Sequence, residues 1–423
     1  MLRFAPSPYH DLHLRDLRIA LISYLVSRQR GEGFLLRFAD TEESRNESRE
    51  ETIKRILEKF AIHTDREMWQ SEQRGRHQQL AVKLLERGDA FLCTCDTAQC
   101  RGDCAAMGRE EIRRIRTEKT PFTLRIRRPR EAIVFNDIIA GETVVEPAEV
   151  DRFVLLRTDG TPTPLFADTC DDILSGITLV IQESTSLADA ARAIHIRRSL
   201  GYDTPIDYAH LPSLRIEETH GALAENTYDS LSVARLLREG FLPDAIINTL
   251  LSLGSKPPTE LFTLPEAVEW FDLSRLSPDP VSFELRRLRT LNREHLRRMD
   301  DRTLSAIFRF ADPEIGRLAK LYLDEAATIN ELEERLQSVF SPKECDSPER
   351  DSLHNLSTLI VEGPYFRDYE ELTRYLSEHS GISGSQLDRL LLKLFTGSSD
   401  GPSARQLYPH IKSYITEIAR CQH

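Results

Sequence analysis

The sequence predicts an α/β nucleotide-binding core of the Rossmann type, an inserted α+β domain, and an all-α region that follows them. Three observations support this prediction. Short apolar runs alternate with amphipathic helical stretches over residues 1–90. Several β-rich runs and a cluster of cysteines come next. From residue 228 onward the apolar residues recur at the helical period.

The first ninety residues alternate strand and helix. Residues 2–8 (LRFAPSP) predict a short strand that runs into a loop, and residues 12–30 predict an amphipathic helix. Two glycines then break the chain before the apolar strand FLLRFAD. Helices are predicted over residues 42–60 and 74–87. Strand–helix–strand order of this kind implies a parallel, doubly wound sheet.

Residues 90–180 interrupt this pattern with β-rich runs, namely FTLRIRR, AIVFNDII and RFVLLRTDG. We interpret them as an insertion, after which the strand GITLVIQES returns to the core. Four of the seven cysteines fall within twelve residues of the insertion: Cys93, Cys95, Cys100 and Cys104. A cluster of this density indicates a metal site rather than disulfides. Four thiolates suffice for a closed, structural zinc site, and free thiols in a reduced cytosol are the alternative.

Composition bounds the class of protein. The chain has 423 residues, 40% hydrophobic and 29% charged, which is an ordinary globular balance with room for two to four domains. No apolar run approaches a membrane span and the start is not a signal peptide, so we expect a cytoplasmic protein without membrane contact. A net charge of −12 argues against non-specific adhesion to nucleic acid. Local basic stretches at 109–119, 125–130 and 284–298 leave specific nucleic-acid contacts open.

Residues 3–18 (RFAPSPYHDLHLRDLR) resemble the first nucleotide-handling signature of the glutamyl-tRNA synthetases, RFAPSPTGxLHxGxxR. These are class I aminoacyl-tRNA synthetases. The resemblance continues through LLRFADTE, QSEQR, the segment 152–178 and AHLP, and into the closing helices GISGSQLDRLLLKLFTG.

The resemblance implies a monomer with a class I core at 1–90 and 170–227, and an acceptor-stem-binding insertion at 91–169. A helical stem-contact domain at 228–298 and a shortened anticodon-binding bundle at 299–423 would follow.

Both ATP signatures depart from the family pattern. In the first, His13 is retained, but Arg15 replaces the small glycine and Asp16 stands at the last position. In the second, the KLSKR-like segment is replaced by Ala222, Leu223, Ala224, Glu225 and Asn226. Removal of one group that stabilises transition-state charge costs ~10²–10³ in rate. The combined losses therefore predict a rate lowered by roughly 10⁴ and argue against ATP binding.

The resemblance also marks an amino-acid pocket. Arg3, which would pair with the substrate's side-chain carboxylate, and Ser7 are retained. The family's ammonium-binding glutamate is Ala39, its tyrosine is Pro164, and a following polar position is Asp168. The arginine that opens its RGEDH-like segment is Gln182. The pocket has thus lost much of its lining for free glutamate.

The remaining family positions concern metal and tRNA. Cys93, Cys95 and Cys104 match zinc ligands of the family's inserted domain, and Cys100 stands at a tyrosine position. Six arginines are candidates for tRNA contact: Arg125, Arg127, Arg128, Arg286, Arg287 and Arg289.

These observations predict a glutamyl-tRNA synthetase-like protein that binds tRNA but does not form glutamyl-adenylate. It would regulate or deliver tRNA, or act as partner subunit to another protein of tRNA metabolism. One alternative is an active, divergent glutamate–tRNA ligase with rearranged ATP contacts. A second alternative is an enzyme whose altered pocket acts on another small molecule.

Overall fold

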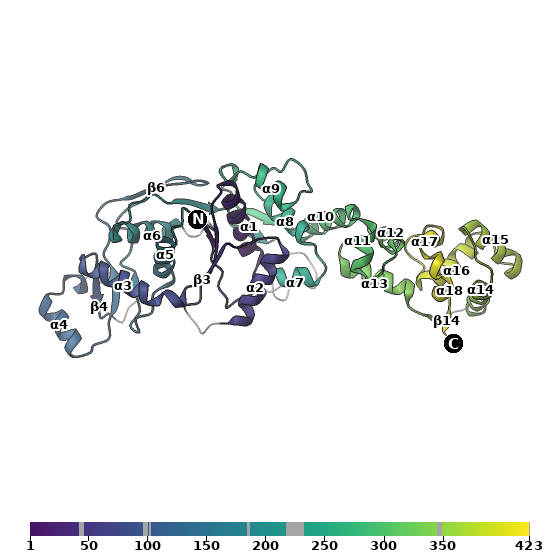
Figure 1. The fold of residues 1–423 in the computed structure, drawn as a ribbon, viewed down its shortest axis with the longest axis horizontal. Helices are drawn as coiled ribbons and strands as arrows, with labels where there is room; N and C mark the ends of the chain where they lie inside the picture. The colour runs from purple at the N-terminus through teal and green to yellow at the C-terminus, as the bar shows by residue number, and fades with distance from the viewer. Residues whose placement is uncertain are drawn as a thin grey trace. The chain divides into compact units, whose positions relative to one another are not determined.

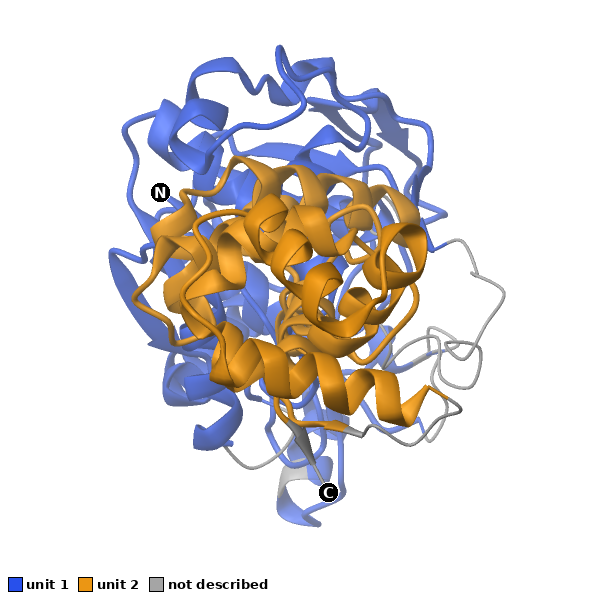
Figure 2. Cartoon of the chain, turned by 90° about the vertical axis from the view of Figure 1, so that its right-hand side faces the viewer, with its two compact units in different colours: residues 1–235, 247–284 blue, residues 236–246, 285–423 orange. Residues whose placement is uncertain are grey.

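The computed structural model describes residues 1–41, 46–95, 100, 103–183, 187–216, 232–344 and 349–422. The chain divides into two compact units, shown in Figure 2. Unit 1 comprises residues 1–235 and 247–284, and unit 2 comprises residues 236–246 and 285–423. Two helices run across the division, α7 (Val233–Arg238) and α8 (Pro243–Ser252).

The core of unit 1 is a doubly wound sheet in two halves. The first half has three parallel strands in the order β1-β2-β3: β1 (Leu2–Phe4), β2 (Phe34–Phe38) and β3 (Arg66–Trp69). Every residue of β2 is buried, as expected for a parallel strand covered on both faces. The predicted parallel core is therefore confirmed.

The second half has the order β7-β6-β10-β9: β6 (Ile133–Asp137), β7 (Gly141–Val145), β9 (Leu179–Glu183) and β10 (Asp207–Leu211). The Thr178 amide donates to the Met1 carbonyl at 3.0 Å, which joins the β9 edge to the β1 edge. Strand β6 differs from its prediction as part of the insertion, because it pairs in parallel with β10 of the core. Buried Asp137 at its end accepts hydrogen bonds from the β10 residue His210, which fixes the strand there.

A separate antiparallel sheet forms the inserted part, in the order β4-β5-β8: β4 (Ala90–Cys93), β5 (Thr123–Ile126) and β8 (Val154–Leu156). Around it lie α3 (Arg74–Glu86), α4 (Arg109–Thr117) and the short turn η2 (Asp103–Ala106). Figure 1 shows α3, β4 and α4 grouped at one end of unit 1. Apolar side chains of β4, β5 and α3 share one buried cluster with α5 and α6, so the insertion and the core pack as one body.

Further helices cover the core. They are α1 (Leu14–Gln29), α2 (Glu47–Lys59), α5 (Pro164–Leu174), α6 (Leu187–Leu200) and α9 (Leu264–Trp270), with the short turns η1 (Ser71–Gln73) and η5 (Leu273–Arg275). A parallel pair, β11 (Leu214–Ile216) and β12 (Val281–Phe283), closes the unit. Helix α1 contacts β1, β2 and β9, so it lies where the two halves of the sheet meet.

Unit 2 is helical in its described part, as the 3.6-residue periodicity predicts. Its helices are α10 (Leu285–Arg298), α11 (Asp301–Ile307), α12 (Pro313–Leu321), α13 (Ile329–Phe340), α14 (Arg350–Glu362), α15 (Tyr369–Ser380), α16 (Gly384–Thr396), α17 (Ala404–Ile411) and α18 (Ile415–Ile418). The turn η6 (Lys412–Tyr414) and a short parallel pair, β13 (Lys343–Glu344) with β14 (Cys421–Gln422), complete it. One continuous apolar core runs through these helices. Within the described residues, no helix is long and apolar enough to cross a bilayer.

The predicted domain of residues 228–298 is shared between the two units. Residues 247–284 belong to unit 1, whereas residues 236–246 and α10 belong to unit 2. Buried Asn292 of α10 explains this division. Its amide accepts a hydrogen bond from the Leu242 amide at 2.7 Å and donates to the Ala327 carbonyl at 2.6 Å, which ties all three segments together.

Candidate functional site

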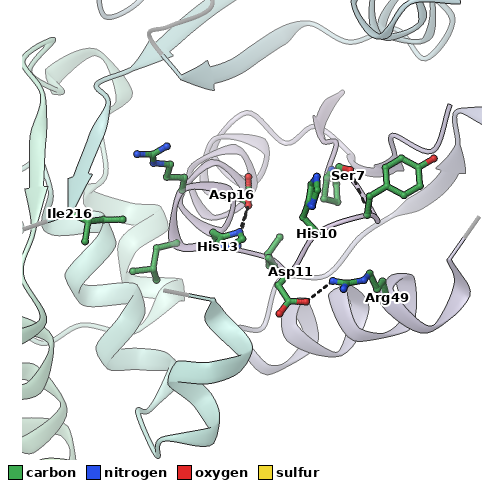
Figure 3. Close-up of a pocket in the computed structure, with 12 residues that line it drawn as sticks. Ser7, His10, Asp11, His13, Asp16, Arg49 and Ile216 are labelled. Carbon is green, nitrogen blue, oxygen red and sulfur yellow. Dashed lines mark hydrogen bonds and ion pairs between the residues drawn. The ribbon is translucent and has the colours of Figure 1, made fainter. Parts of the chain in front are cut away.

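A cavity of about 750 Å³ lies beside the first turn of α1 (Figure 3). We call it the N-terminal cavity. Its lining comes from Pro6, Ser7, residues 9–16, Arg49 of α2 and Ile216 of β11. The sequence-predicted signature at residues 3–18 therefore forms a concave site.

The start of α1 is fixed by two side chains of that signature. His13 has an extended backbone and is the residue before the helix, and the Asp16 carboxylate accepts its amide hydrogen at 3.0 Å. This capping interaction stabilises the helix start. Burial raises the pKa of Asp16, although His13 nearby acts in the opposite direction. The carboxylate also places negative charge where a helix N-terminus would otherwise attract an anion.

Arg15 lies on the wall of the N-terminal cavity rather than turned away from it. Its Nη2 donates to the Leu214 carbonyl at 3.1 Å, and its Nε lies 3.8 Å from the Glu183 carboxylate. The side chain is 38% exposed. Arg15 therefore bridges α1 to the ends of β9 and β11 and keeps a positive charge beside the cavity.

The altered second signature, Ala222 to Asn226, lies outside the described residues. The chain that follows it returns to the first signature. The Val233 amide donates to the Leu12 carbonyl at 2.8 Å, and Ser232 forms an isolated antiparallel bridge with His13. This pairing anchors the segment after the second signature beside the cavity.

Arg3 and Asp168, both predicted for the amino-acid pocket, belong to a buried network of charges. Arg3 donates through Nε and Nη2 to the Asp172 carboxylate, at 3.0 and 3.2 Å. Fully buried Arg37 donates to Asp172 at 2.6 Å and to Asp168 at 2.8 Å. Burial raises the pKa of Asp172, but Arg3 and Arg37 outweigh this and leave it below its ordinary value of 3.8. Among the described residues, Arg3 retains Nη1 for a ligand.

The network continues to residues for which the sequence suggested no role. Gln70 donates to Asp168 at 2.9 Å and to Asp171 at 3.0 Å. Asp171 lies 2.7 Å from His77, and both side chains are fully buried. These residues come from the QSEQR segment, α3 and α5. Charged residues inside strongly apolar stretches, such as the Asp171–Asp172 pair, were the available signal.

Gln182 is held by a buried histidine–aspartate pair. Its Nε2 lies 2.7 Å from His210 Nε2, and His210 Nδ1 lies 2.6 Å from Asp137. Burial raises the pKa of Asp137, but the hydrogen bond from His210 and those from the Ile139 and Ala140 amides lower it overall. A neutral amide thus occupies a fixed place at the end of β9.

The remaining residues predicted for the amino-acid pocket do not all lie together. Ser7 lines the N-terminal cavity, and its hydroxyl accepts from the Tyr9 amide at 3.4 Å. The Ala39 amide donates to the Pro6 carbonyl at 3.0 Å, so Ala39 lies against the same loop. Pro164 is the exposed first residue of α5 and serves to begin that helix. The structure therefore places Ser7 at the cavity and Ala39 beside it, but not Pro164.

The four clustered cysteines converge. The sulfur atoms of Cys93, Cys95, Cys100 and Cys104 all lie within 4.8 Å of one another. Tetrahedral zinc with Zn–S bonds of ~2.3 Å requires sulfur–sulfur separations near 3.8 Å, so the donor set fits zinc in number, type and spacing. Cys93 and Cys104 are buried.

The arginines proposed for tRNA contact differ in exposure. Arg125 is only 3% exposed and donates to the Arg152 carbonyl, so it supports the inserted sheet rather than a surface. Arg289 is paired with Glu331 through two bonds, of 2.8 and 3.1 Å. The remaining four are exposed: Arg127 and Arg128 after β5, and Arg286 and Arg287 on α10.

A doubly wound sheet with an antiparallel insertion, and a histidine-bearing signature at its first helix, define the catalytic domain of a class I aminoacyl-tRNA synthetase. The family model for the catalytic domain of class I tRNA synthetases (E and Q) matches residues 1–290.

Full-length relatives narrow this further. A glutamate–tRNA ligase 2 of Sulfurovum sp. is 44% identical over 429 residues, covering 99% of this chain and 100% of the relative. A second, from Sulfurimonas denitrificans, is 38% identical with the same coverage. The solved structure of a glutamate–tRNA ligase from Elizabethkingia meningosepticum, in complex with its amino acid, superposes with a TM-score of 0.81 at 24% identity. It covers 99% of this chain and 97% of that one, and it supports the fold. The chain belongs to the glutamyl-tRNA synthetase family of class I.

Proposed function

We propose that the chain is a glutamate–tRNA ligase that activates glutamate with ATP and transfers it to tRNA. The observation that carries this proposal is the lining of the N-terminal cavity. His10, His13, Arg15 and Arg49 bring two imidazoles and two guanidinium groups to one cavity at the family's ATP signature. Such groups can stabilise the charge that develops as pyrophosphate leaves. This proposal favours the alternative of an active, divergent enzyme over loss of ATP binding.

The full-length relatives support the same reaction. They are named glutamate–tRNA ligases at 37–44% identity and match 99% of this chain. Arg3, with Nη1 directed to no protein partner among the described residues, is proposed to bind the glutamate side chain.

The test is glutamylation of tRNA by the full-length protein. Labelled glutamate, ATP and total tRNA should yield glutamyl-tRNA. Arg3→Gln should lower kcat/KM by at least tenfold, because the substrate carboxylate then has no charged partner at this position. If wild-type protein forms no glutamyl-tRNA with any tRNA fraction, the proposal is wrong.

A second candidate is a tRNA-binding protein that does not form the adenylate. Two observations favour it. Asp16 places a carboxylate at the anion-binding end of α1, and the second signature contains neither lysine nor arginine at residues 222–226. Retention of tRNA binding without ATP–pyrophosphate exchange would establish this candidate instead.

We propose that tRNA is bound through exposed arginines, namely Arg127 and Arg128 in unit 1 and Arg286 and Arg287 in unit 2. We also propose that Cys93, Cys95, Cys100 and Cys104 hold a structural zinc ion. Metal binding at such a site stabilises the folded state of the segment that carries the ligands.

A further inference from the structure

Arg49 differs from Arg15, which also lines the N-terminal cavity, in the contacts that hold its side chain. Arg15 is fixed by a carbonyl and a carboxylate, as described above. Within the part of the chain that the structure describes, Arg49 Nη1 instead makes one ion pair, at 2.6 Å, with Asp11. Figure 3 shows Asp11 reaching from the loop before α1 toward Arg49 on α2. The two side chains, Arg49 and Asp11, are 41% and 52% exposed.

The backbone around Arg49 is fixed while its side chain remains exchangeable. The Asn46 side chain accepts the Arg49 amide hydrogen at 3.2 Å and thereby caps α2, so Arg49 lies in the first helical turn. An exposed ion pair is worth only about 0–1 kcal/mol, because water screens both charges. The guanidinium can therefore change partners without loss of local structure.

The charges of the cavity balance when no ligand is present. Asp11 and Asp16 oppose Arg15 and Arg49 within the same lining. A phosphate group that entered would meet Asp11 as a competitor for Arg49. Arginine can bind phosphate through two parallel charge-assisted hydrogen bonds, whereas Asp11 accepts a single bond from Arg49 Nη1.

We propose that Arg49 is the phosphate-binding residue of the N-terminal cavity and that Asp11 holds it until a nucleoside triphosphate displaces the carboxylate. This inference rests on the proposed function and identifies how its ATP is held. Arg49 thereby supplies positive charge that residues 222–226 do not carry.

The experiment is calorimetric titration of the full-length protein with ATP and, separately, with adenosine, which lacks phosphate. Arg49→Gln should weaken ATP binding about tenfold and leave adenosine binding unchanged, because only the phosphates contact the guanidinium. Arg49→Lys should recover part of the loss, since it keeps the charge but not the paired donors.

Asp11→Asn gives a test of opposite sign. Removal of the competing carboxylate should strengthen ATP binding by about two- to fivefold, the range of an exposed pair. In the double variant this gain should vanish, because Asp11 acts only through Arg49. Arg55→Gln is the matched control: Arg55 is exposed on the same helix, donates to the Glu51 carbonyl and lies outside the cavity lining, so ATP affinity should not change.

Failure of this inference is distinguishable from failure of the proposed function. If wild-type protein binds ATP and Arg49→Gln binds it equally well, Arg49 is not the phosphate ligand, and the ligase proposal stands. If Arg49→Gln weakens adenosine and ATP alike, the phosphate role is also wrong. If ATP binding depends on Arg49 but no glutamyl-tRNA forms, the inference holds and the ligase proposal fails.

Discussion

At the scale of single residues, buried and exposed ion pairs contribute very differently to stability. Asp172 sits between Arg3 and Arg37 in the interior, whereas Asp189 pairs with Arg192 at 2.7 Å on a half-exposed surface. Loss of one partner of a buried pair leaves an uncompensated charge and costs ~3–5 kcal/mol. The exposed pair contributes about 0–1 kcal/mol.

Asp172→Asn should therefore destabilise the protein strongly at pH 7, while Asp189→Asn should change little. The pKa of Asp172 is lowered on folding, so its stabilising contribution is complete above the ordinary value of 3.8 and is lost as the pH falls through the lower folded value. Thermal unfolding from pH 7 to pH 3 should show a shallower acid loss for Asp172→Asn than for wild type. Parallel pH profiles would contradict this role.

The sequence identified some of these residues and missed others for a physical reason. The signature of residues 3–18 predicted the position of the cavity because His13 and Ser7, which line it, lie close together in the sequence. Arg49 and Ile216 were missed, since tertiary packing brings them to the cavity from α2 and β11. The partners of Arg3 and Gln182 were missed likewise, because side-chain contacts between residues 169 and 28 positions apart leave no periodic signal.

At the scale of elements, the close approach of α11 and α12 depends on Gly316. A Cβ atom at this position would lie 2.0 Å from the Asp301 carbonyl oxygen. Gly316→Ala should therefore lower stability by ~1–3 kcal/mol, despite the better helix propensity of alanine. Calorimetric unfolding measures the change.

Gly75 in α3 is the matched control for that substitution. A Cβ atom there has no neighbour within 4 Å, so Gly75→Ala should be neutral or stabilising by up to ~1 kcal/mol. Equal effects of the two substitutions would show that helix propensity, not the contact with Asp301, decides the outcome.

The cysteine cluster provides a second prediction at the scale of elements. We expect one zinc ion per chain by elemental analysis, and about none in Cys95→Ser/Cys104→Ser. Because metal binding stabilises the fold around its ligands, a chelator should increase protease cleavage near β4 and η2. The isolated Cys170, buried in α5, supplies the control, since Cys170→Ala should keep the metal. Full metal content in the double variant would refute the site.

At the scale of the whole molecule, an acidic chain must bind an anionic partner through local basic surfaces. Arg286→Ala/Arg287→Ala should weaken tRNA binding and reduce the slope of log affinity against log salt by about one for each phosphate that no longer has an arginine partner. Arg289→Gln should change tRNA affinity less, because Glu331 already neutralises Arg289. Gel shifts over a salt series measure both. Equal reductions in affinity for the exposed and the paired arginines would contradict this assignment.

The architecture was predictable where the pattern is local. Strand–helix alternation predicted the parallel core, and helical periodicity predicted the bundle. The position of β6 was not predictable from residues 132–139, because its membership of the core sheet depends on pairing with β10 and on the buried Asp137–His210 contact. The assignment of α10 to unit 2 depends similarly on Asn292.

The central claim is that this protein catalyses the reaction of its family. Glutamate-dependent ATP–pyrophosphate exchange, measured with and without tRNA, tests this claim most directly. We predict exchange that requires glutamate and falls about tenfold in Arg49→Gln. Absence of exchange in wild-type protein that still binds tRNA would contradict this claim.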